Sequence, residues 1–432
     1  MTSTFEQLGL AAEILQAVAD EGYSEPTPIQ SAAIPVVLAG RDVLATAQTG
    51  TGKTAAFVLP ILQRLKAQAN TSFSPARHPV RALVVTPTRE LAVQVADSVA
   101  GYARHLPLRS TVAYGGVPIE PQAKALLGGV EILVATPGRL LDHLGSRTVN
   151  LSQVEVLVLD EADRMLDMGF MPDIRRILDA LPAKRQNLMF SATFSDDVRG
   201  LAGQILRDPE RIAVAPKNAT ADRVRQLVYP VDRDRKEELL AHLIRKDDLR
   251  QVLVFTRTKL AAARLASWLD RRGIEATAIH GDRSQADRSR ALEMFKSGTV
   301  RVLVATDVAA RGLDIEDLPH VVNFELPFDP QDYIHRIGRT ARAGLDGDAI
   351  SLVCIDETDL LRGVQRMLKV AIPWAVEDGF IPDRNAEPRP VRVPGGRTGG
   401  GAPRRAPAAS TPATASRGGR SRRRRGTGAA AA

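Results

Sequence analysis

The chain has 432 residues, of which 44% are hydrophobic, and this is enough for two or three domains with separate buried cores. No run of about 18 apolar residues occurs, and the first residues lack the basic and apolar regions of a signal peptide, so we expect a soluble cytoplasmic protein without a membrane span. The single cysteine, Cys354, excludes an intrachain disulfide framework and a cysteine-rich metal site, and it is expected to be a small buried residue.

The net charge of +8 originates at the C-terminal end of the chain. Residues 388–432 contain 11 arginines and no acidic residue, whereas residues 1–387 carry 47 basic and 50 acidic side chains, a net charge of −3. Nucleic-acid binding by the folded part would therefore need a local groove. Aromatic residues make up only 4% of the chain, too few for a protein that binds single strands by base stacking alone.

Apolar, β-branched runs alternate with helical patterns from residue 42 onward. In the first half of the chain the predicted strands are residues 42–46, 81–86, 110–114, 131–135, 156–159 and 187–190. The alternation restarts in the second half, with predicted strands at residues 251–256, 275–279, 301–305, 320–323 and 349–354. Continuous apolar strands suit parallel sheets that are covered by helices on both faces, so we predict two doubly wound α/β domains.

Composition also predicts the domain boundaries. Residues 216–223 are polar and lack apolar periodicity, so we predict a flexible linker between a first domain at residues 1–215 and a second at residues 224–375. The C-terminal segment, residues 376–432, becomes rich in Gly, Pro, Ala and Arg after about Asp383. We predict a disordered tail there, because too few large apolar side chains are present to offset the entropy cost of ordering.

A phosphate-binding loop is predicted between the first strand and the following helix. Gly50 and Gly52 allow backbone N–H groups to approach phosphate oxygens, Lys53 reaches the β- and γ-phosphates, and Thr54 ligates Mg²⁺. Ala47 stands where the general pattern has glycine. The residues predicted to bind a nucleoside triphosphate here are Ala47, Gln48, Thr49, Gly50, Thr51, Gly52, Lys53 and Thr54.

Two acidic residues, Asp160 and Glu161, follow the apolar run at residues 156–159. Side chains at the carboxyl end of such a strand face the crevice where ligands bind in open α/β sheets. We expect Asp160 to hold Mg²⁺, usually through water, and Glu161 to polarise the attacking water. Two carboxylates at a strand end are by themselves more often part of a solvated loop, so this assignment depends on the phosphate loop.

Asp160-Glu161-Ala162-Asp163 resembles the signature of the DEAD-box RNA helicases, and other motifs of that family follow in order over residues 3–370. The resemblance implies two RecA-like domains with ATP and Mg²⁺ as ligands. Residues 3–31 resemble the adenine-reading Q motif, which implies that Gln30 hydrogen-bonds adenine and that Phe5 packs on its ring. From the residues alone, Phe5 is read as a core residue.

Three segments of the first domain resemble the RNA-contacting motifs of the family, and each follows a predicted strand along one rim of the sheet. Arg and Thr side chains and Gly backbone amides bind phosphate and sugar oxygens there, which gives affinity without sequence readout. Each segment alone would be read as a turn. The implied RNA ligands are Pro87, Thr88, Arg89, Gly116, Thr136, Pro137, Gly138 and Arg139.

Arg339 and Arg342 are predicted to lie on one face at the start of a helix, at positions i and i+3. Basic side chains on one face of a helix usually point into solvent. In the family this face would join the catalytic site when the two domains close, and the two guanidinium groups would act as arginine fingers on the γ-phosphate.

Other segments resemble motifs that couple the two domains or bind RNA. The resemblance implies that Asp314 binds the ribose hydroxyls, and that the coupling residues are Asp163, Ser191, Thr193, Arg311 and His335. The implied RNA ligands of the second domain are Arg257, Gly281, Gln285, Arg288 and Thr306. For His280 and His335 a hydrogen-bonded structural role is an equal alternative.

The predicted function is ATP-driven unwinding of short RNA duplexes with little sequence preference, by a monomer that acts in ribosomal or RNA-decay assemblies. Residues 22–30 and 320–332, together with the short basic tail, are most similar to the bacterial RhlE-type branch of the family. An ATP-gated RNA clamp and a DNA helicase remain alternatives, because phosphate and sugar contacts do not by themselves distinguish the nucleic acids. The Arg-rich tail is expected to add non-specific RNA affinity or only to aid solubility.

Overall fold

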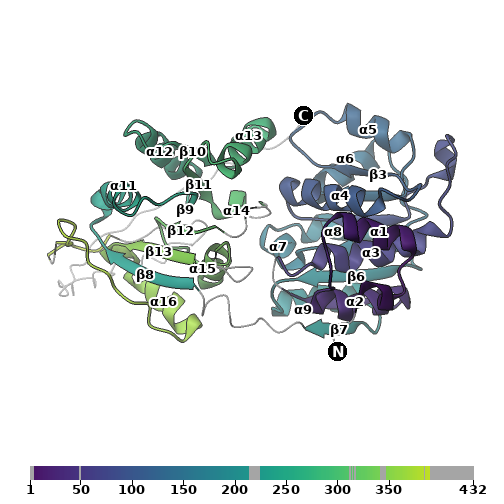
Figure 1. Ribbon diagram of the computed structural model, residues 1–432, viewed down its shortest axis with the longest axis horizontal. Coiled ribbons are helices and arrows are strands. Elements are labelled where there is room, and N and C mark those ends of the chain that lie inside the picture. Colours follow the sequence, from purple (N-terminus) through teal and green to yellow (C-terminus); the bar gives the residue numbers. More distant parts are fainter. Residues whose placement is uncertain are drawn as a thin grey trace, which may run out of the picture. The chain divides into compact units, whose positions relative to one another are not determined.

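The computed structural model describes residues 4–47, 50–213, 224–310, 313, 315, 318–340, 347–383 and 385–389. Within these ranges the chain forms two parallel β-sheets, each covered by helices on both faces (Figure 1). The predicted pair of doubly wound α/β domains is therefore confirmed. The predicted linker at residues 216–223 lies outside the described residues.

The first sheet has the strand order β3-β4-β2-β5-β6-β1-β7, and all of its neighbouring strands are parallel. Because β5 and β1 both pair with β6, the segments that follow these three strands meet at one edge of the sheet. The strands are β1 (Val43–Thr46), β2 (Ala82–Val85), β3 (Ser110–Ala113), β4 (Ile132–Ala135), β5 (Val156–Leu159), β6 (Gln186–Ser191) and β7 (Glu210–Ala213).

The helices of the first domain bury two separate hydrophobic clusters, one on each face of the sheet. Alternate strand residues point to opposite faces, so Val43 and Ala45 join one cluster whereas Leu44 joins the other. One cluster is covered by η1 (Phe5–Leu8), α1 (Ala12–Asp20), α2 (Pro28–Leu38), α3 (Lys53–Lys66) and α4 (Arg89–Ala103). The other is covered by α5 (Glu120–Leu127), α6 (Pro137–Gly145), α7 (Ala162–Asp167), α8 (Met171–Asp179) and α9 (Asp196–Ile205).

The second sheet is also parallel and has the strand order β10-β11-β9-β12-β13-β8. Its strands are β8 (Val224–Pro230), β9 (Val252–Thr256), β10 (Ala276–Ile279), β11 (Val302–Thr306), β12 (His320–Asn323) and β13 (Gly347–Val353). Its α-helices are α11 (Lys236–Lys246), α12 (Lys259–Asp270), α13 (Gln285–Lys296), α14 (Asp307–Ala310), α15 (Pro330–Ile337) and α16 (Thr358–Leu368). Three short 3₁₀ helices complete the list of elements: η2 (Pro75–Arg77) in the first domain, and η3 (Arg233–Arg235) and η4 (Ile355–Glu357) in the second.

All eleven predicted strands are present, each within two residues of its predicted bounds. Two strands, β7 and β8, were not predicted. Each contains charged or polar residues, such as Glu210 and Arg225, and each pairs with only one neighbour at an edge of its sheet, so neither shows the apolar run of a central strand. Within the described ranges no helix is long and apolar enough to cross a membrane.

The described residues from 372 onward pack against the second domain, and we call residues 372–383 and 385–389 the C-terminal strap. Val228 of β8 donates its N–H to Pro373 O at 2.9 Å and accepts the Ala375 N–H at 2.8 Å. Phe380 packs against the hydrophobic cluster under α11, and Glu377 binds His242 and Lys246 on that helix. The prediction that disorder begins at residue 376 is therefore wrong for these residues; residues 384 and 390–432 lie outside the described ranges.

Candidate active site

The phosphate loop connects the end of β1 with the start of α3, as predicted. Gly50 and Gly52 have φ angles of 77° and 87°, in the left-handed region that favours glycine. A Cβ atom added at Gly52 would lie 2.4 Å from Gln30 Nε2, so a side chain at this position would displace the Gln30 amide. Gln48 and Thr49 lie outside the described residues.

Lys53 is the first residue of α3 and is only 6% exposed. Its Nζ atom is buried and has no hydrogen-bond partner among the described residues. A buried ammonium group without a partner is costly, whereas phosphate oxygens in this loop would satisfy it. The residues present therefore fit a nucleoside triphosphate.

Gln30 lies in α2 and connects the Q-motif segment to the phosphate loop. Its Oε1 atom accepts the Thr27 N–H at 2.9 Å, and its Nε2 group donates to Gly52 O at 3.2 Å. Phe5, in η1, is 5% exposed and belongs to the hydrophobic core of the domain. In this structure Phe5 is thus a core residue, as the sequence alone indicates. The contact of Phe5 with adenine stays a prediction.

Asp160 and Glu161 follow β5 on the same edge of the sheet as the phosphate loop. Asp160 is 3% exposed, and burial raises its pKa to about 6, although the nearby Lys53 opposes this shift. Glu161 has a φ angle of 53°, which is rare for a residue with a side chain and costs free energy. A buried carboxylate near the Lys53 ammonium group fits a Mg²⁺ ligand, directly or through water.

Asp163 is bound to the segment that follows β6. Its Oδ2 atom accepts hydrogen bonds from Ala192 N at 3.2 Å, Thr193 N at 2.9 Å and Thr193 Oγ1 at 3.0 Å. Ser191 Oγ in turn donates to Thr193 O at 2.8 Å. These hydrogen bonds join three of the predicted coupling residues, Asp163, Ser191 and Thr193, whereas their role in coupling stays a prediction.

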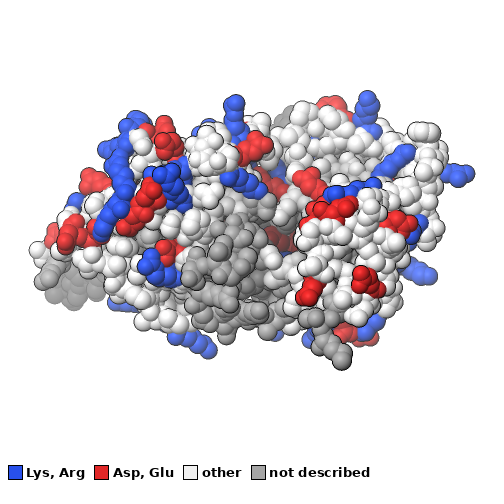
Figure 2. All heavy atoms as spheres, viewed as in Figure 1, with Lys and Arg blue, Asp and Glu red and all other residues white. Residues whose placement is uncertain are grey.

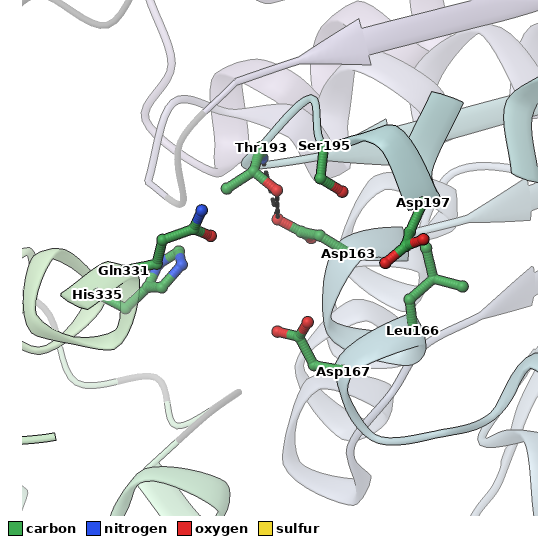
Figure 3. A pocket seen from close by; sticks show the side chains of 8 residues that line it. All are labelled: Asp163, Leu166, Asp167, Thr193, Ser195, Asp197, Gln331 and His335. Carbon is green, nitrogen blue, oxygen red and sulfur yellow. Dashed lines mark hydrogen bonds between the residues drawn. The ribbon is translucent and has the colours of Figure 1, made fainter. Parts of the chain in front are cut away.

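Asp163 and Thr193 also line a polar cavity of about 280 Å³ (Figure 3). Gln331 and His335 on α15 face these two residues across the cavity. The other lining residues are Leu166, Asp167, Ser195 and Asp197. The structure thus places His335 on the same cavity as Asp163 and Thr193, two other predicted coupling residues.

The predicted helical placement of Arg339 is wrong. Helix α15 ends at Ile337 with Gly338 as its C-cap, so Arg339 follows the helix in a turn. Arg339 is 8% exposed and donates from Nη1 to Leu313 O at 3.0 Å. Arg342, Arg311 and Asp314 lie outside the described residues, so their predicted roles have no structural description.

Arg336 was not predicted as a site residue, yet it is the largest side chain that is fully buried among the described residues. It binds Asp307 through two hydrogen bonds, from Nε at 2.6 Å and from Nη2 at 2.7 Å, and it also donates to Asn323 Oδ1 at 3.0 Å. Its spacing from the apolar Tyr333 and Ile337 places it on the buried face of α15. This spacing, in which Arg336 shares a helix face with two apolar residues, is the sequence signal that could have identified it as a buried arginine.

The predicted RNA segments of the first domain follow β2, β3 and β4, which are neighbours in the sheet. The guanidinium group of Arg89 lies against Gly116, where an added Cβ atom would be 2.1 Å from Arg89 Nη1. Thr88 Oγ1 caps α4 by accepting the Leu91 N–H at 3.3 Å. Arg139, in the first turn of α6, donates to Gln122 Oε1 at 3.1 Å and to Val117 O at 2.9 Å.

At the start of α6, Thr136 is the N-cap but its side chain makes no capping hydrogen bond, and Pro137 and Gly138 follow it. The backbone N–H groups of a first helical turn have no partners within the helix, so they can bind phosphate. The expectation that the three segments lie along one rim of the sheet is confirmed by the strand order.

Two predicted RNA ligands of the second domain bind a protein side chain in this structure. Gln285 Nε2 donates to Glu90 Oε1 at 3.1 Å, and Arg288 Nε donates to the same oxygen at 2.7 Å. Both residues therefore contact α4 of the first domain, and their contacts with RNA stay predictions. Glu90 directly follows Arg89, but its pairing could not be read from the sequence because its partners are almost 200 residues away.

The other predicted residues of the second domain lie at the carboxyl edge of the sheet, with Gly281 after β10, Thr306 at the end of β11 and Arg257 after β9. His280 is 7% exposed, burial lowers its pKa, and neither ring nitrogen has a hydrogen-bond partner among the described residues. The described residues therefore do not give His280 the hydrogen-bonded structural role that was the alternative for it.

The surface drawn in Figure 2 carries basic and acidic side chains interspersed with one another over its described part. This agrees with the net charge of −3 for residues 1–387. RNA affinity of the folded part would therefore depend on the groups at the sheet edges rather than on a broad positive field.

Comparison with known proteins gives consistent matches over both domains. The family described as DEAD/DEAH box helicase matches residues 27–201, and the helicase conserved C-terminal domain matches residues 235–344. The chain is 44% identical over 360 residues to the DEAD-box ATP-dependent RNA helicase RhpA of Helicobacter pylori, a match that covers 83% of this chain and 71% of that protein. It is 43% identical over 367 residues to CshA of Bacillus cereus, covering 85% and 68% of the two chains.

Solved structures of nucleotide- and RNA-bound helicases share the fold. Dbp5 of S. cerevisiae bound to RNA and ADP BeF3 is 31% identical, with a TM-score of 0.76 over 87% of this chain and 96% of that one. Mss116p bound to ssRNA and AMP-PNP is 29% identical, with a TM-score of 0.76 over 88% and 80% of the two chains. The chain belongs to the DEAD-box family of ATP-dependent RNA helicases, and it is an ATP-hydrolysing enzyme.

Proposed function

We propose that this helicase uses RNA-stimulated ATP hydrolysis to close its two domains on RNA and to separate short duplexes locally. The observation that carries the proposal is the edge of the first sheet, where the ammonium group of Lys53 lies near Asp160 and has no hydrogen-bond partner in the described part of the chain. The same edge holds Asp163, whose hydrogen bonds reach the segment after β6. A nucleotide bound there would be connected directly to groups that face the second domain.

The proposed roles follow from the chemistry of each residue. Lys53 and the N–H groups of the loop bind the β- and γ-phosphates, and Gln30 binds adenine. Thr54 and Asp160 hold Mg²⁺, which neutralises phosphate charge when bound. Glu161 orients the attacking water, and Arg339 and Arg342 stabilise the charge that develops in phosphoryl transfer.

RNA is proposed to bind along the carboxyl edges of the two sheets, through Arg89, Gly116, the start of α6, Arg257 and Thr306. These groups suit phosphate and sugar oxygens rather than base edges, so little sequence preference is expected. The solved structures of Dbp5 and Mss116p contain RNA together with a nucleotide, and this supports simultaneous binding of both ligands here.

The test is RNA-stimulated ATP hydrolysis by the full chain, followed by ATP-dependent displacement of one strand of a short RNA duplex. Glu161→Gln should bind ATP but hydrolyse it poorly, because the amide is a much weaker base than the carboxylate. Stimulated hydrolysis without strand displacement would favour the alternative of an ATP-gated RNA clamp. Equal stimulation by DNA of the same sequence would contradict an RNA-specific function, because only contacts to the 2′-hydroxyl distinguish the two nucleic acids.

We also propose that the chain belongs to the RhlE-type branch, that it acts as a cytoplasmic monomer and that its RNA partners belong to ribosomal or RNA-decay assemblies. Residues 22–30 and 320–332 support the branch, and the buried thiol of Cys354 is compatible with a reducing compartment. Sequencing of transcripts crosslinked to the protein in cells would test the choice of RNA, and the absence of ribosomal or decay-associated RNA would contradict it.

A further inference from the structure

Four charged side chains gather at the carboxyl edge of the second sheet, and we call Lys236, Arg257, Glu325 and Glu357 the edge network. They follow β8, β9, β12 and β13, which occupy four consecutive positions in the sheet. Lys236 and Glu357 are buried, with side chains 4% and 1% exposed, whereas the side chain of Arg257 is 13% exposed. The network thus extends from a fully buried ion pair to an arginine that reaches the surface.

Glu357 is the centre of this network. Its Oε2 atom accepts a hydrogen bond from Lys236 Nζ, and its Oε1 atom accepts the Leu326 N–H at 3.2 Å and lies 3.2 Å from Arg257 Nη2. Lys236 Nζ also donates to Phe324 O at 2.9 Å. The buried carboxylate is therefore satisfied by one ammonium group, one guanidinium group and the backbone after β12.

Arg257 is held on several sides. Its backbone N–H and its Nη2 group both bind Glu325, at 2.7 Å and 3.3 Å, and its Nη1 group donates to Leu326 O at 3.4 Å. The guanidinium group also lies over the ring of Phe328, 5.2 Å from its centroid. Contacts with Leu326, Glu325 and Glu357 use three of the five N–H donors of the guanidinium group, so within the described ranges two remain for a phosphate.

We infer that Glu357 is a positioning residue that holds Arg257 in the orientation for binding an RNA phosphate, an inference that rests on the proposed function. A free arginine side chain loses considerable rotamer entropy when it binds a ligand, whereas one already held by carboxylates loses less. Lys236 has a different role: it balances the charge of Glu357 and keeps the carboxylate stable in a buried site.

This difference gives a test that separates positioning from stability. Glu357→Gln removes the ionic contact with Arg257 and leaves the Lys236 ammonium group buried, so both stability and RNA binding should fall. Lys236→Met keeps the pair between Glu357 and Arg257 but removes the balancing charge, so stability should fall while RNA binding stays close to the wild type. The double variant Lys236→Met/Glu357→Gln has no unbalanced charge, so it should recover stability but not RNA binding.

The measurements are the melting temperature of each full-length variant and the RNA concentration that gives half-maximal ATP hydrolysis. We expect the double variant and Arg257→Met to need about tenfold more RNA, the loss typical of one charge-assisted hydrogen bond, with a smaller change in the maximal rate. Asp359→Asn, in the exposed pair with Arg362 on α16, is the matched control and should match the wild type in both measurements.

The inference would be overturned if the RNA concentration for half-maximal ATP hydrolysis changed in parallel with the melting temperature. In that case Lys236→Met would need as much RNA as Glu357→Gln, and the double variant would need no more RNA than the wild type. The inference would also be overturned if Arg257→Met needed no more RNA than the wild type, because no ligand would then be positioned. A wild-type chain whose ATP hydrolysis does not respond to RNA would instead contradict the proposed function itself.

Discussion

Thr193 binds Asp163 through both its backbone N–H, at 2.9 Å, and its side-chain hydroxyl, at 3.0 Å. The carboxylate belongs to the acidic segment after β5, and the threonine belongs to the segment after β6, which pairs with β5. Asp163 and Thr193 also line the cavity that Gln331 and His335 enter from α15 (Figure 3). A change in the acidic segment on ATP hydrolysis would therefore reach the surface that faces α15.

Thr193→Val should reduce strand displacement more than ATP hydrolysis. Valine keeps the backbone hydrogen bond to Asp163 but lacks the hydroxyl, and this should cost about 1 kcal/mol of stability. Parallel assays of RNA-stimulated hydrolysis and of duplex displacement check the prediction. The control is Ser195→Ala, which removes the hydroxyl that caps α9. It should lower the melting temperature but change ATP hydrolysis and strand displacement by the same factor. Equal losses of both activities in Thr193→Val would contradict a coupling role.

Gly52→Ala should abolish ATP binding. The added Cβ atom would meet Gln30 Nε2 at 2.4 Å and would force alanine into a left-handed conformation, which costs about 1–2 kcal/mol. Binding of a fluorescent ATP analogue measures the effect. Gly203→Ala in α9 has open space around its added Cβ atom and should bind the analogue normally. Normal binding by Gly52→Ala would show that the loop adopts another conformation with nucleotide.

The affinity for Mg²⁺ and ATP should decrease as the pH falls through about 6. Burial raises the pKa of Asp160 to this value, so the carboxylate that is expected to hold the ion becomes protonated below it. Protons then compete with Mg²⁺, and higher Mg²⁺ concentrations should move the transition to lower pH. Binding isotherms between pH 5 and 8 test this, with Asp160→Asn as the control that should lack this pH-dependent step. If the affinity of the wild type changed with pH in the same way as that of Asp160→Asn, this result would contradict the assignment of Asp160 as the Mg²⁺ ligand that is protonated near pH 6.

Truncation after residue 375 should destabilise the second domain, whereas truncation after residue 389 should not. The first change removes Phe380 from the cluster under α11 and removes Glu377 from His242 and Lys246. We expect a loss of about 1–3 kcal/mol, mainly from the apolar contact, since His242 and Lys246, the partners of Glu377, have side chains that are 41% and 50% exposed. Thermal unfolding of the two truncated chains measures the difference. Identical melting temperatures would show that the strap adds no stability.

Deletion of residues 390–432 should weaken RNA binding and flatten its dependence on salt. This segment contains ten of the 11 arginines found after residue 387, and each phosphate that it neutralises releases counterions. Titration of RNA at several salt concentrations gives the slope, and the maximal ATPase rate should remain near that of the full chain. A large loss of that rate would indicate that the deleted residues contribute to the active site.

The central strands could be read from the sequence because each is a continuous apolar run between helical patterns. The edge strands β7 and β8 could not, because charged residues interrupt them and their stability comes from pairing with distant strands. The strap was missed for a related reason. Its large apolar residues, such as Val376, Phe380 and Ile381, are interrupted by Gly379 and Pro382, and its order depends on contacts with residues far away in the chain, such as that of Phe380 with the second domain.

For the active site, the sequence by itself determined the phosphate loop and the acidic segment, because their chemistry depends on residues adjacent in the chain and on the strands that precede them. Only the tertiary structure decided which predicted RNA ligands bind protein groups, as Arg288 binds Glu90, and which buried partners hold Arg257. It also placed Arg339 after α15 rather than on it. These features depend on distances between segments far apart in the chain, and local residue patterns do not specify such distances.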